Sequence, residues 1–272
     1  MAAARRAETR SRMFIPGGAI VVVLAIVVAL VVVRLSSRTT TADTGPATGT
    51  ALPASVMKDV TTVPPGTLDA VGAGSVPSTV QTPVTALSGT PLTAGGKPEM
   101  LYIGAEFCPY CAAMRWSMAV ALSRFGTLSP LRGIRSASTD VYPDTATLTF
   151  YKSRYQSRYL AFTPVENEKI DHSPLQGTTP AQQRIWNSYD AGSYPFIDVG
   201  NKYMIGVIYN PSVLQGKTWS QIAAALHDPS SPVAKGADGA ANYLTAAICT
   251  VTDDSPASVC ASPAIAALQS KL

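Results

Sequence analysis

Apolar residues are unevenly distributed along this chain, and their densest run lies near the N-terminus. Residues 13–33 carry no charged side chain, and the centre of this run reads AIVVVLAIVVALVVV. About 20 helical residues, each rising ~1.5 Å, span the ~30 Å hydrocarbon layer of a bilayer. We therefore predict a single transmembrane helix over residues 13–34. A cleaved signal peptide is the alternative, although its apolar region normally runs for only about 7 to 15 residues.

The pattern behind this run predicts a linker followed by one folded domain. Residues 35–53 are rich in Ser, Thr, Gly and Pro and poor in large apolar side chains, which is typical of a flexible tether. The domain is expected over residues 54–272. Within it, residues 99–105 predict a short apolar strand, and residues 112–125 place apolar side chains at helical spacing.

Later elements are indicated by turn and capping patterns. Thr179 with Gln182, and Thr218 with Gln221, have the spacing of a capping box and predict two helix starts. Strand patterns flank Gly200 and predict a hairpin. The remaining expected elements are a strand near 131–139, a second hairpin formed by 147–151 with 158–166, and two short helices near 242–249 and 262–269.

Charge gives the orientation of the apolar run. Among residues 1–12 there are four arginines and one glutamate, whereas only Arg34 and Arg38 follow closely. Basic residues stay on the cytoplasmic side of a membrane, so residues 1–12 are expected to form a cytoplasmic tail and the C-terminal body to be extracytoplasmic. The net charge of +4 comes partly from this cluster. Since no basic stripe interleaved with aromatic residues appears in the body, we expect no nucleic-acid partner.

Candidate chemistry is concentrated in GAEFCPYCAAMRW, where Cys108 and Cys111 lie between the predicted strand and helix. At such a turn the first cysteine begins the helix, where unpaired amides and the helix dipole favour a negative charge. Thiol pKa values in these motifs fall from about 8.5 to the range of about 3.5 to 7.5. Cys108 is therefore predicted to be the attacking thiolate and Cys111 the resolving thiol. This chemistry needs no bound cofactor, because the electrons reside on the two sulfurs.

The order of the motifs resembles the thioredoxin superfamily. CPYC follows a strand, and Tyr194-Pro195 precedes a late hairpin and helix. The resemblance implies an α/β, thioredoxin-like fold in which a cis proline faces the cysteine pair, with Tyr194 and Pro195 binding substrate. The dipeptide between the cysteines is the variant associated with glutaredoxins.

A narrower resemblance rests on GAEFCPYCAAMRW, LTFYKSRYQSRYLAFTPVE and NYLTAAICTVTDDSPASVC. Together these segments are similar to a prokaryotic membrane-anchored thioredoxin-like family known as a domain of unknown function (DUF929-like), which would cover the chain from about residue 54 to its end. Members often carry an acid where this chain has Met114. Cys111 and Pro195 are 84 positions apart, more than the simplest thioredoxin-like members need. We therefore expect an inserted β-hairpin region at about 138–178 and a C-terminal helical extension at about 228–272.

Other polar residues have open roles. Glu106 is either a proton relay or a solvated carboxylate at a strand end. Arg115 would favour the thiolate if it reached Cys108, but its helix position lies a full turn past Cys111. The two histidines, His172 and His227, are expected to be incidental.

Cys249 and Cys260 are separated by ten residues that include the turn-forming DDSP. In an exported domain they are predicted to form a structural disulfide, stabilising by roughly 3 kcal/mol. A relay that re-oxidises the first pair is the alternative.

These patterns lead to a membrane-anchored, extracytoplasmic thiol–disulfide oxidoreductase that acts on the cysteines of exported proteins, with an unidentified membrane redox partner. An oxidant or isomerase is favoured over a reductant. One alternative is a redox-inactive binding or scaffold module, and another is a copper or zinc thiolate carrier. A closed zinc site normally has four ligands, and the chain offers no second C-x-x-C pair, so we expect no metal.

Overall fold

The computed structural model describes residues 49–75, 83–129 and 131–272. The predicted cytoplasmic tail and transmembrane helix, and residues 35–48 of the predicted linker, lie outside these ranges. Within them, no helix combines the length and the apolar character that crossing a membrane requires. The chain is already paired in a strand at β1 (Thr50–Ala51), inside the segment expected to be a linker.

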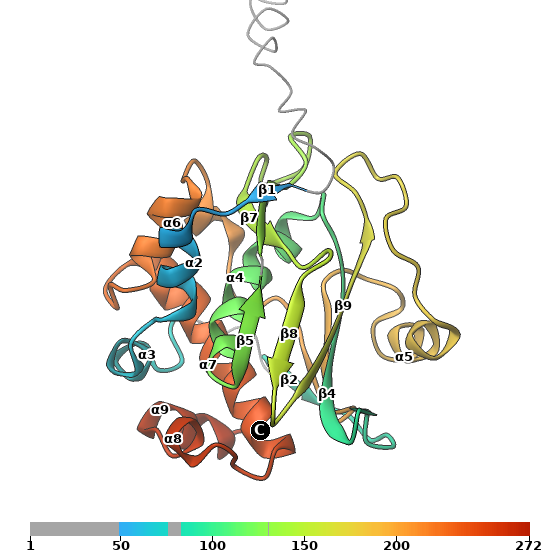
Figure 1. Cartoon of the computed structure of the whole chain (residues 1–272), viewed down its shortest axis with the longest axis vertical. Coiled ribbons are helices and arrows are strands. Elements are labelled where there is room, and N and C mark those ends of the chain that lie inside the picture. Colours follow the sequence, from blue (N-terminus) through green and yellow to red (C-terminus); the bar gives the residue numbers. More distant parts are fainter. Residues whose placement is uncertain (1–48, 76–82, 130) are drawn as a thin grey trace, which may run out of the picture. The chain divides into compact units, whose positions relative to one another are not determined.

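A mixed sheet lies at the centre of the described domain (Figure 1). Its middle strand is β4 (Lys97–Ala105), which confirms the strand predicted over 99–105. The strand β9 (Ala161–Glu168) pairs with β4 in parallel, and β10 (Phe196–Val199) pairs with it antiparallel. The order is β2-β11-β10-β4-β3, where the other strands are β2 (Val84–Ala86), β3 (Thr93–Ala94) and β11 (Tyr203–Ile205). The predicted hairpin is confirmed as β10 and β11, joined at Gly200 and Asn201.

The hairpin predicted from 147–151 and 158–166 is wrong. The strand β7 (Ala146–Thr149) pairs with β6 (Arg132–Arg135), the strand predicted near 131–139, and β6 also pairs with β1. The intervening β8 (Arg154–Ser157) pairs with β5 (Gly126–Ser129). Alternating side chains determine which face of a strand is buried but not which strand lies beside it. The segment 138–178, expected as an inserted hairpin region, thus supplies β9 to the central sheet.

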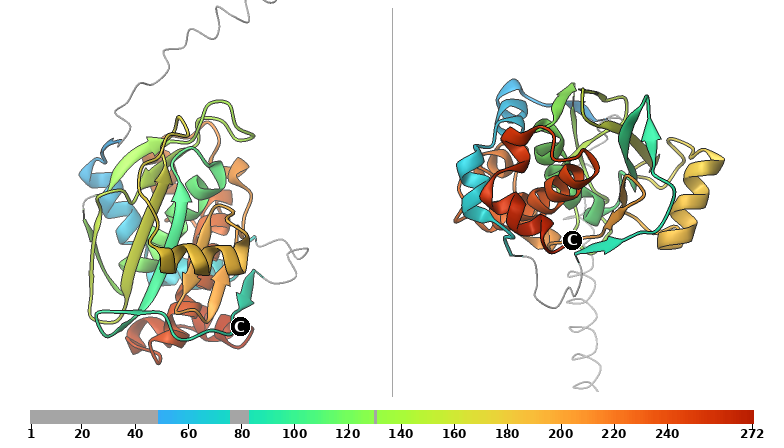
Figure 2. Two further views of the ribbon diagram at one scale, coloured as in Figure 1. Left: turned by 90° about the vertical axis from the view of Figure 1, so that its right-hand side faces the viewer. Right: turned by 90° about the horizontal axis from the view of Figure 1, so that it is seen from below.

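Helices cover both faces of this sheet (Figures 1 and 2). The helix α5 (Pro180–Asp190) covers one face, where Leu101 and Ile103 of β4 pack with Trp186. The helices α4 (Pro109–Ser123) and α7 (Pro232–Val251) cover the other, where Met100 and Tyr102 are buried. Because both faces are covered, β4 is buried continuously from Glu99 to Ala105 and does not alternate between buried and exposed residues.

The helix α4 is confirmed in place but differs from its predicted packing. Every residue from Cys111 to Leu122 is buried, so the helix has no solvent-facing side. It ends at Ser123, two residues before the end of the predicted range, and β5 begins at Gly126.

The helix α7 is much longer than the short helix predicted near 242–249. Its first half contains Gly236 and Gly239, where a β-carbon would come within 2.6 Å of the Tyr209 ring and 2.8 Å of the Ala73 carbonyl oxygen. A larger residue would not fit at either position. Because glycine gives no apolar signal, the sequence pattern did not predict the first half of this helix.

Both predicted capping boxes are confirmed, at the start of α5 and of α6 (Trp219–Ala225). The N-terminal part of the domain forms α2 (Ala54–Thr61) and α3 (Pro65–Val71). The chain also contains a 3-10 helix, η1 (Pro211–Leu214), and ends with α8 (Ala257–Cys260) and α9 (Pro263–Gln269), the latter at the position predicted for the last helix.

Candidate active site around Cys108 and Cys111

The cysteine pair lies where β4 ends and α4 begins. Cys108 is the N-cap residue of α4, with Pro109 in the first helical position. The backbone N–H of Cys111 donates a hydrogen bond to Cys108 Sγ at 3.2 Å. Cys108 is 5% exposed and Cys111 is completely buried, and the two sulfurs are not bonded to each other. Cys108 is therefore the more accessible of the two residues.

The pKa values of the two thiols are shifted in opposite directions. A hydrogen bond from the Cys111 side chain lowers the pKa of Cys108, and the Cys111 backbone N–H and the Arg115 charge add to this effect against the opposing effect of burial. Burial raises the pKa of Cys111 well above its ordinary value. The pair therefore favours a thiolate at Cys108 and a proton on Cys111.

A buried ion pair lies behind the cysteines. Arg115 Nη2 donates to Glu166 Oε2 at 2.6 Å, and Arg115 Nε donates to Glu166 Oε1 at 2.9 Å. Both side chains are fully buried. Arg115 Nη2 also donates to the carbonyl oxygen of Ala105 at 2.7 Å, and Ala105 packs against both cysteines. The arginine thus turns back from α4 beneath the active-site turn.

Sequence reasoning missed Glu166, the partner of this arginine. The residue lies on β9, in the segment expected to be an inserted hairpin, and nothing in the local pattern distinguishes it from other acids. Only the parallel pairing of β9 with β4 brings it beneath the cysteine turn.

Glu106 is buried rather than solvated. Its Oε1 accepts a hydrogen bond from Thr149 Oγ1 at 2.8 Å, and burial raises its pKa to about 7. No hydrogen bond joins it to either cysteine; the charges acting on it include those of Glu166 and Arg115. The structure therefore places this carboxyl with the buried ion pair, and its relay role stays a prediction.

Tyr194 and Pro195 lie against the cysteine turn. Their peptide bond is cis, and Tyr194 packs on the cluster of Ala105, Cys108 and Cys111. The Tyr194 hydroxyl donates to Glu168 Oε1 at 3.0 Å and accepts from the side-chain amide of Asn167. Its ring stacks on Trp186 of α5 with centroids 5.1 Å apart. These contacts hold the segment in front of β10 beside the two sulfurs.

Two residues not assigned a role border the site. The Phe107 ring, directly before Cys108, lies 3.9 Å from the His172 ring and 6.1 Å from the Tyr194 ring, centroid to centroid. His172, expected to be incidental, is therefore close to the cysteine turn. His227 lies elsewhere, with Nε2 at 2.8 Å from the carbonyl oxygen of Asp59.

The second cysteine pair is separate from this site. A disulfide joins Cys249 of α7 to Cys260 of α8. In Figure 1 the helices α8 and α9 lie at the lower end of the domain, whereas β4 runs upward to the cysteine turn. Among residues 49–75, 83–129 and 131–272, no group of three or more His, Cys, Asp or Glu side chains is arranged to hold a metal ion.

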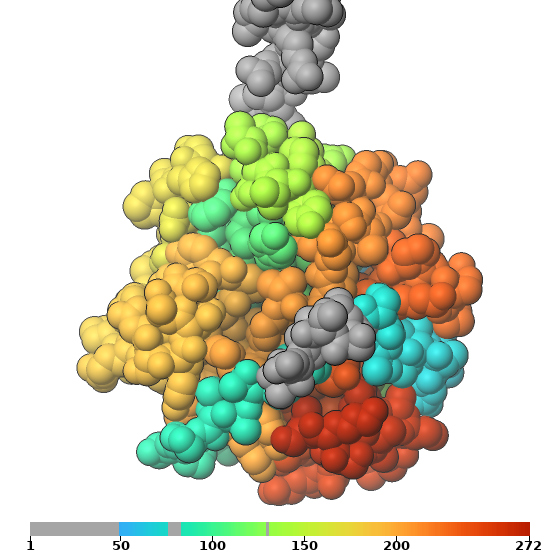
Figure 3. Space-filling model, turned by 180° about the vertical axis from the view of Figure 1, so that it is seen from behind, coloured from blue at the N-terminus to red at the C-terminus, as the bar shows by residue number. Residues whose placement is uncertain are grey.

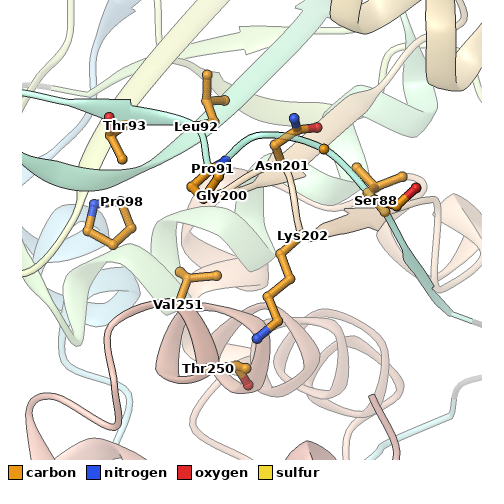
Figure 4. Close-up of a pocket in the computed structure, with 12 residues that line it drawn as sticks. Ser88, Pro91, Leu92, Thr93, Pro98, Gly200, Asn201, Lys202, Thr250 and Val251 are labelled. Carbon is orange, nitrogen blue, oxygen red and sulfur yellow. The ribbon is translucent and has the colours of Figure 1, made fainter.

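A cavity of about 330 Å³ lies at the opposite end of β4. It is lined by the segment around Leu92, by the turn between β10 and β11, and by the end of α7, and Lys202 extends across it toward Thr250 (Figure 4). None of the predicted site residues lines this cavity.

These features define a mixed α/β domain with a vicinal cysteine pair, one thiol at a helix N-terminus and the other buried. Residues 83–250, more than half of the chain, match the family described as "Domain of unknown function (DUF929)", so the protein belongs to the DUF929 family. Comparisons with curated proteins and with solved structures gave no match.

Proposed function

We propose that this protein is a thiol–disulfide oxidoreductase of thioredoxin-like fold that acts through Cys108 and Cys111 on cysteines of other exported proteins. The observation that carries the proposal is the asymmetry of the pair. Cys108 caps α4, accepts the Cys111 N–H and retains 5% exposure, while Cys111 is buried. A purely structural pair has no need of one activated and one protected sulfur.

The arrangement around the pair supports the thioredoxin-like assignment. A strand, the cysteine pair and a helix follow one another as β4 and α4, and β9 lies parallel to β4. Tyr194-Pro195 then leads into β10, which is antiparallel to β4 and continues into the β10–β11 hairpin. This is the order that suggested the superfamily from the sequence.

The reaction runs in two exchange steps. With the pair oxidised, a partner thiolate attacks Cys108 Sγ, the Cys108–Cys111 bond breaks, and Cys111 leaves as a thiolate that takes up a proton. A second partner thiolate then attacks the partner sulfur of the mixed disulfide and releases Cys108 as a thiolate. The partner gains a disulfide and the pair gains two electrons, which an oxidised membrane redox partner must remove.

The acidity of Cys108 supports oxidation over reduction as the direction of electron flow. The interactions that lower its pKa stabilise the reduced form of the pair. A pair whose reduced form is stabilised has a higher reduction potential, so its disulfide form is a stronger oxidant. Oxidation or isomerisation of exported proteins is therefore the proposed role, rather than reduction.

An extracytoplasmic location is part of the proposal. The Cys249–Cys260 disulfide suits an oxidising compartment, where structural disulfides persist. The apolar run at 13–34, preceded by its arginine cluster, would anchor the domain to the outer face of the membrane.

A trapping experiment tests the proposal. In the full-length Cys111→Ser variant, the Cys108 thiolate attacks partner disulfides but nothing resolves the product, so adducts with exported proteins should accumulate and disappear on reduction. The matched control is the Cys108→Ser/Cys111→Ser variant, which should trap nothing. If Cys108 forms no adduct and is alkylated at neutral pH no faster than a model thiol, the redox-inactive scaffold becomes the better hypothesis.

A further inference from the structure

One exposed apolar side chain lies in the cysteine turn and a second in the loop that is hydrogen-bonded to this turn. In the part of the chain that the structure describes, Tyr110, at 37% exposure, and Val141, at 66%, are the large apolar residues that remain exposed. Isolated exposed apolar residues are common and need no explanation. These two are connected, because Tyr142, next to Val141, packs edge-to-face on Tyr110 with ring centroids 5.8 Å apart.

The loop that carries Val141 is fixed in position. At its base, the Ala137 N–H donates to the Phe107 carbonyl oxygen at 2.9 Å. Near its tip, the Tyr142 carbonyl oxygen accepts from Ser136 Oγ at 3.2 Å and from Thr145 Oγ1 at 2.9 Å. The loop is therefore bonded to the residue before Cys108, and its tip contacts the second residue after it. Val141 is exposed on this hydrogen-bonded loop, although burying such a side chain would stabilise by about 1.5–3 kcal/mol.

Cys108 lies between this loop and a second aromatic group. On its other side, the Phe107 ring contacts His172 and Tyr194. In Figure 3 the green start of α4 reaches the surface between the lime loop that follows β6 and the yellow segment that follows β9. Because Cys108 is only 5% exposed, an extended chain can reach it more readily than a folded surface can.

The charge of the loop favours one kind of chain. Asp140 and Asp144 flank its apolar tip. Arg135 Nη1 donates to the Asp144 carbonyl oxygen at 2.8 Å and offsets one of these two charges, so the loop keeps a net negative charge at Asp140. A docked segment with Lys or Arg beside its apolar residue would meet opposite charges, while an acidic segment would meet like charges.

We propose that Tyr110, Val141 and Tyr142 form a docking surface for an extended segment of an unfolded polypeptide, which places an apolar side chain and a basic neighbour close to its own cysteine. This rests on the proposed function and specifies its substrate class. The apolar side chain of the segment covers Val141 and Tyr110 while its cysteine reaches Cys108.

Paired substrates test this surface. The first is an unstructured peptide disulfide with Leu and Lys near the cysteine, and the second is a small aromatic disulfide that has no chain to dock. For Val141→Asp, kcat/KM with the peptide should fall about tenfold, the equivalent of 1.4 kcal/mol of transition-state binding. The rate with the small disulfide should stay within about twofold. The matched control, Ala267→Asp, adds the same charge to an exposed position of α9 and should change neither rate.

The charge argument has its own variant. Asp140→Lys/Asp144→Lys should reverse the preference between the Lys peptide and the same peptide with Glu in place of Lys. Equal losses with both disulfides, or no loss with the peptide, would overturn the docking surface. If the unmodified protein reacts with neither disulfide and its oxidised form does not oxidise the corresponding thiols, the proposed function fails. Fluorescence anisotropy of the Cys→Ser peptide then still decides whether Val141→Asp weakens docking.

Discussion

At the level of single residues, two fully buried charges are expected to have the largest effect on the cysteine pair. Arg115 and Glu166 are buried behind the cysteine turn and bonded to each other through two hydrogen bonds. The Arg115 guanidinium donates a hydrogen bond to the carbonyl oxygen of Ala105, next to the thiols, and its positive charge lowers the pKa of Cys108. The ion pair is therefore expected to influence the reactivity of the site and not only its stability.

Substitutions of the two members of this ion pair should shift the pKa of Cys108 in opposite directions. Arg115→Met removes the cation and should move the pH midpoint of Cys108 alkylation upward. Glu166→Gln leaves the cation without its counter-ion and should move the same midpoint downward. Both variants should lose stability, by about 3–5 kcal/mol, because each leaves one buried charge unpaired. Iodoacetamide alkylation rates between pH 4 and 9 measure the midpoints.

The double variant Arg115→Met/Glu166→Leu separates charge from folding. Replacing a buried ion pair by apolar residues is often neutral for stability, so this protein should fold while its Cys108 midpoint stays raised. Midpoints that move the same way in both single variants would show that the pair acts only by holding the fold.

At the level of helices and strands, α7 shows how close packing limits substitution. Gly239 lies mid-helix, and a β-carbon there would meet the Ala73 carbonyl oxygen at 2.8 Å and Gly74 Cα at 2.9 Å. Both are backbone atoms of the turn after α3, so neither can rotate away. At Gly66 of α3, by contrast, no atom of the described part of the chain lies within 4 Å of the β-carbon position.

Alanine should therefore have opposite effects at the two glycines. Helix propensity alone favours alanine over glycine by about 1 kcal/mol in a helix interior. Gly66→Ala should gain up to that amount, while Gly239→Ala should lose stability despite the same propensity gain. Urea unfolding of both variants checks the prediction, and a stabilised Gly239→Ala would mean that α3 and α7 pack less tightly than described.

The elements that the sequence predicted are those with local signals. The capping boxes at Thr179 and Thr218 located two helix starts, because a cap is made within four residues. The CPYC turn and the Tyr194-Pro195 segment were also predictable as motifs. The partner of β9, the length of α7 and the contact of Glu166 with Arg115 depend on residues 50 or more positions away, or on glycines that carry no apolar signal.

For the whole molecule, buried carboxyl groups should govern the dependence of stability on pH. Burial raises the pKa of Glu106 to about 7, of Asp198 to about 6 and of Asp238 to about 8. In the unfolded chain these groups titrate near pH 4. Between about pH 4 and pH 8 the native state thus holds more protons than the unfolded state, and stability falls as the pH rises.

Asp238 should contribute most to this trend. It is fully buried in α7, and within the described residues neither of its oxygens has a hydrogen-bond partner. We expect the free energy of unfolding to be lower at pH 8 than at pH 5, and Asp238→Asn to flatten the difference. Urea unfolding at the two pH values measures this. A slope that Asp238→Asn does not change would show that the carboxyl is charged in the native protein.

The disulfide at the far end of the domain has a consequence for how the chain matures. Four cysteines allow three pairings. Three positions separate Cys108 from Cys111, the proposed redox pair, and eleven separate Cys249 from Cys260, which are disulfide-bonded, so each cysteine's partner is its nearest neighbour in sequence. A crossed link from Cys111 to Cys249 would close a loop of 138 positions at an extra entropic cost of about 2 kcal/mol relative to the Cys249–Cys260 loop. Random oxidation of the nascent polypeptide therefore favours correct connectivity, and this protein should reach its native form without help from the kind of enzyme that it is proposed to be.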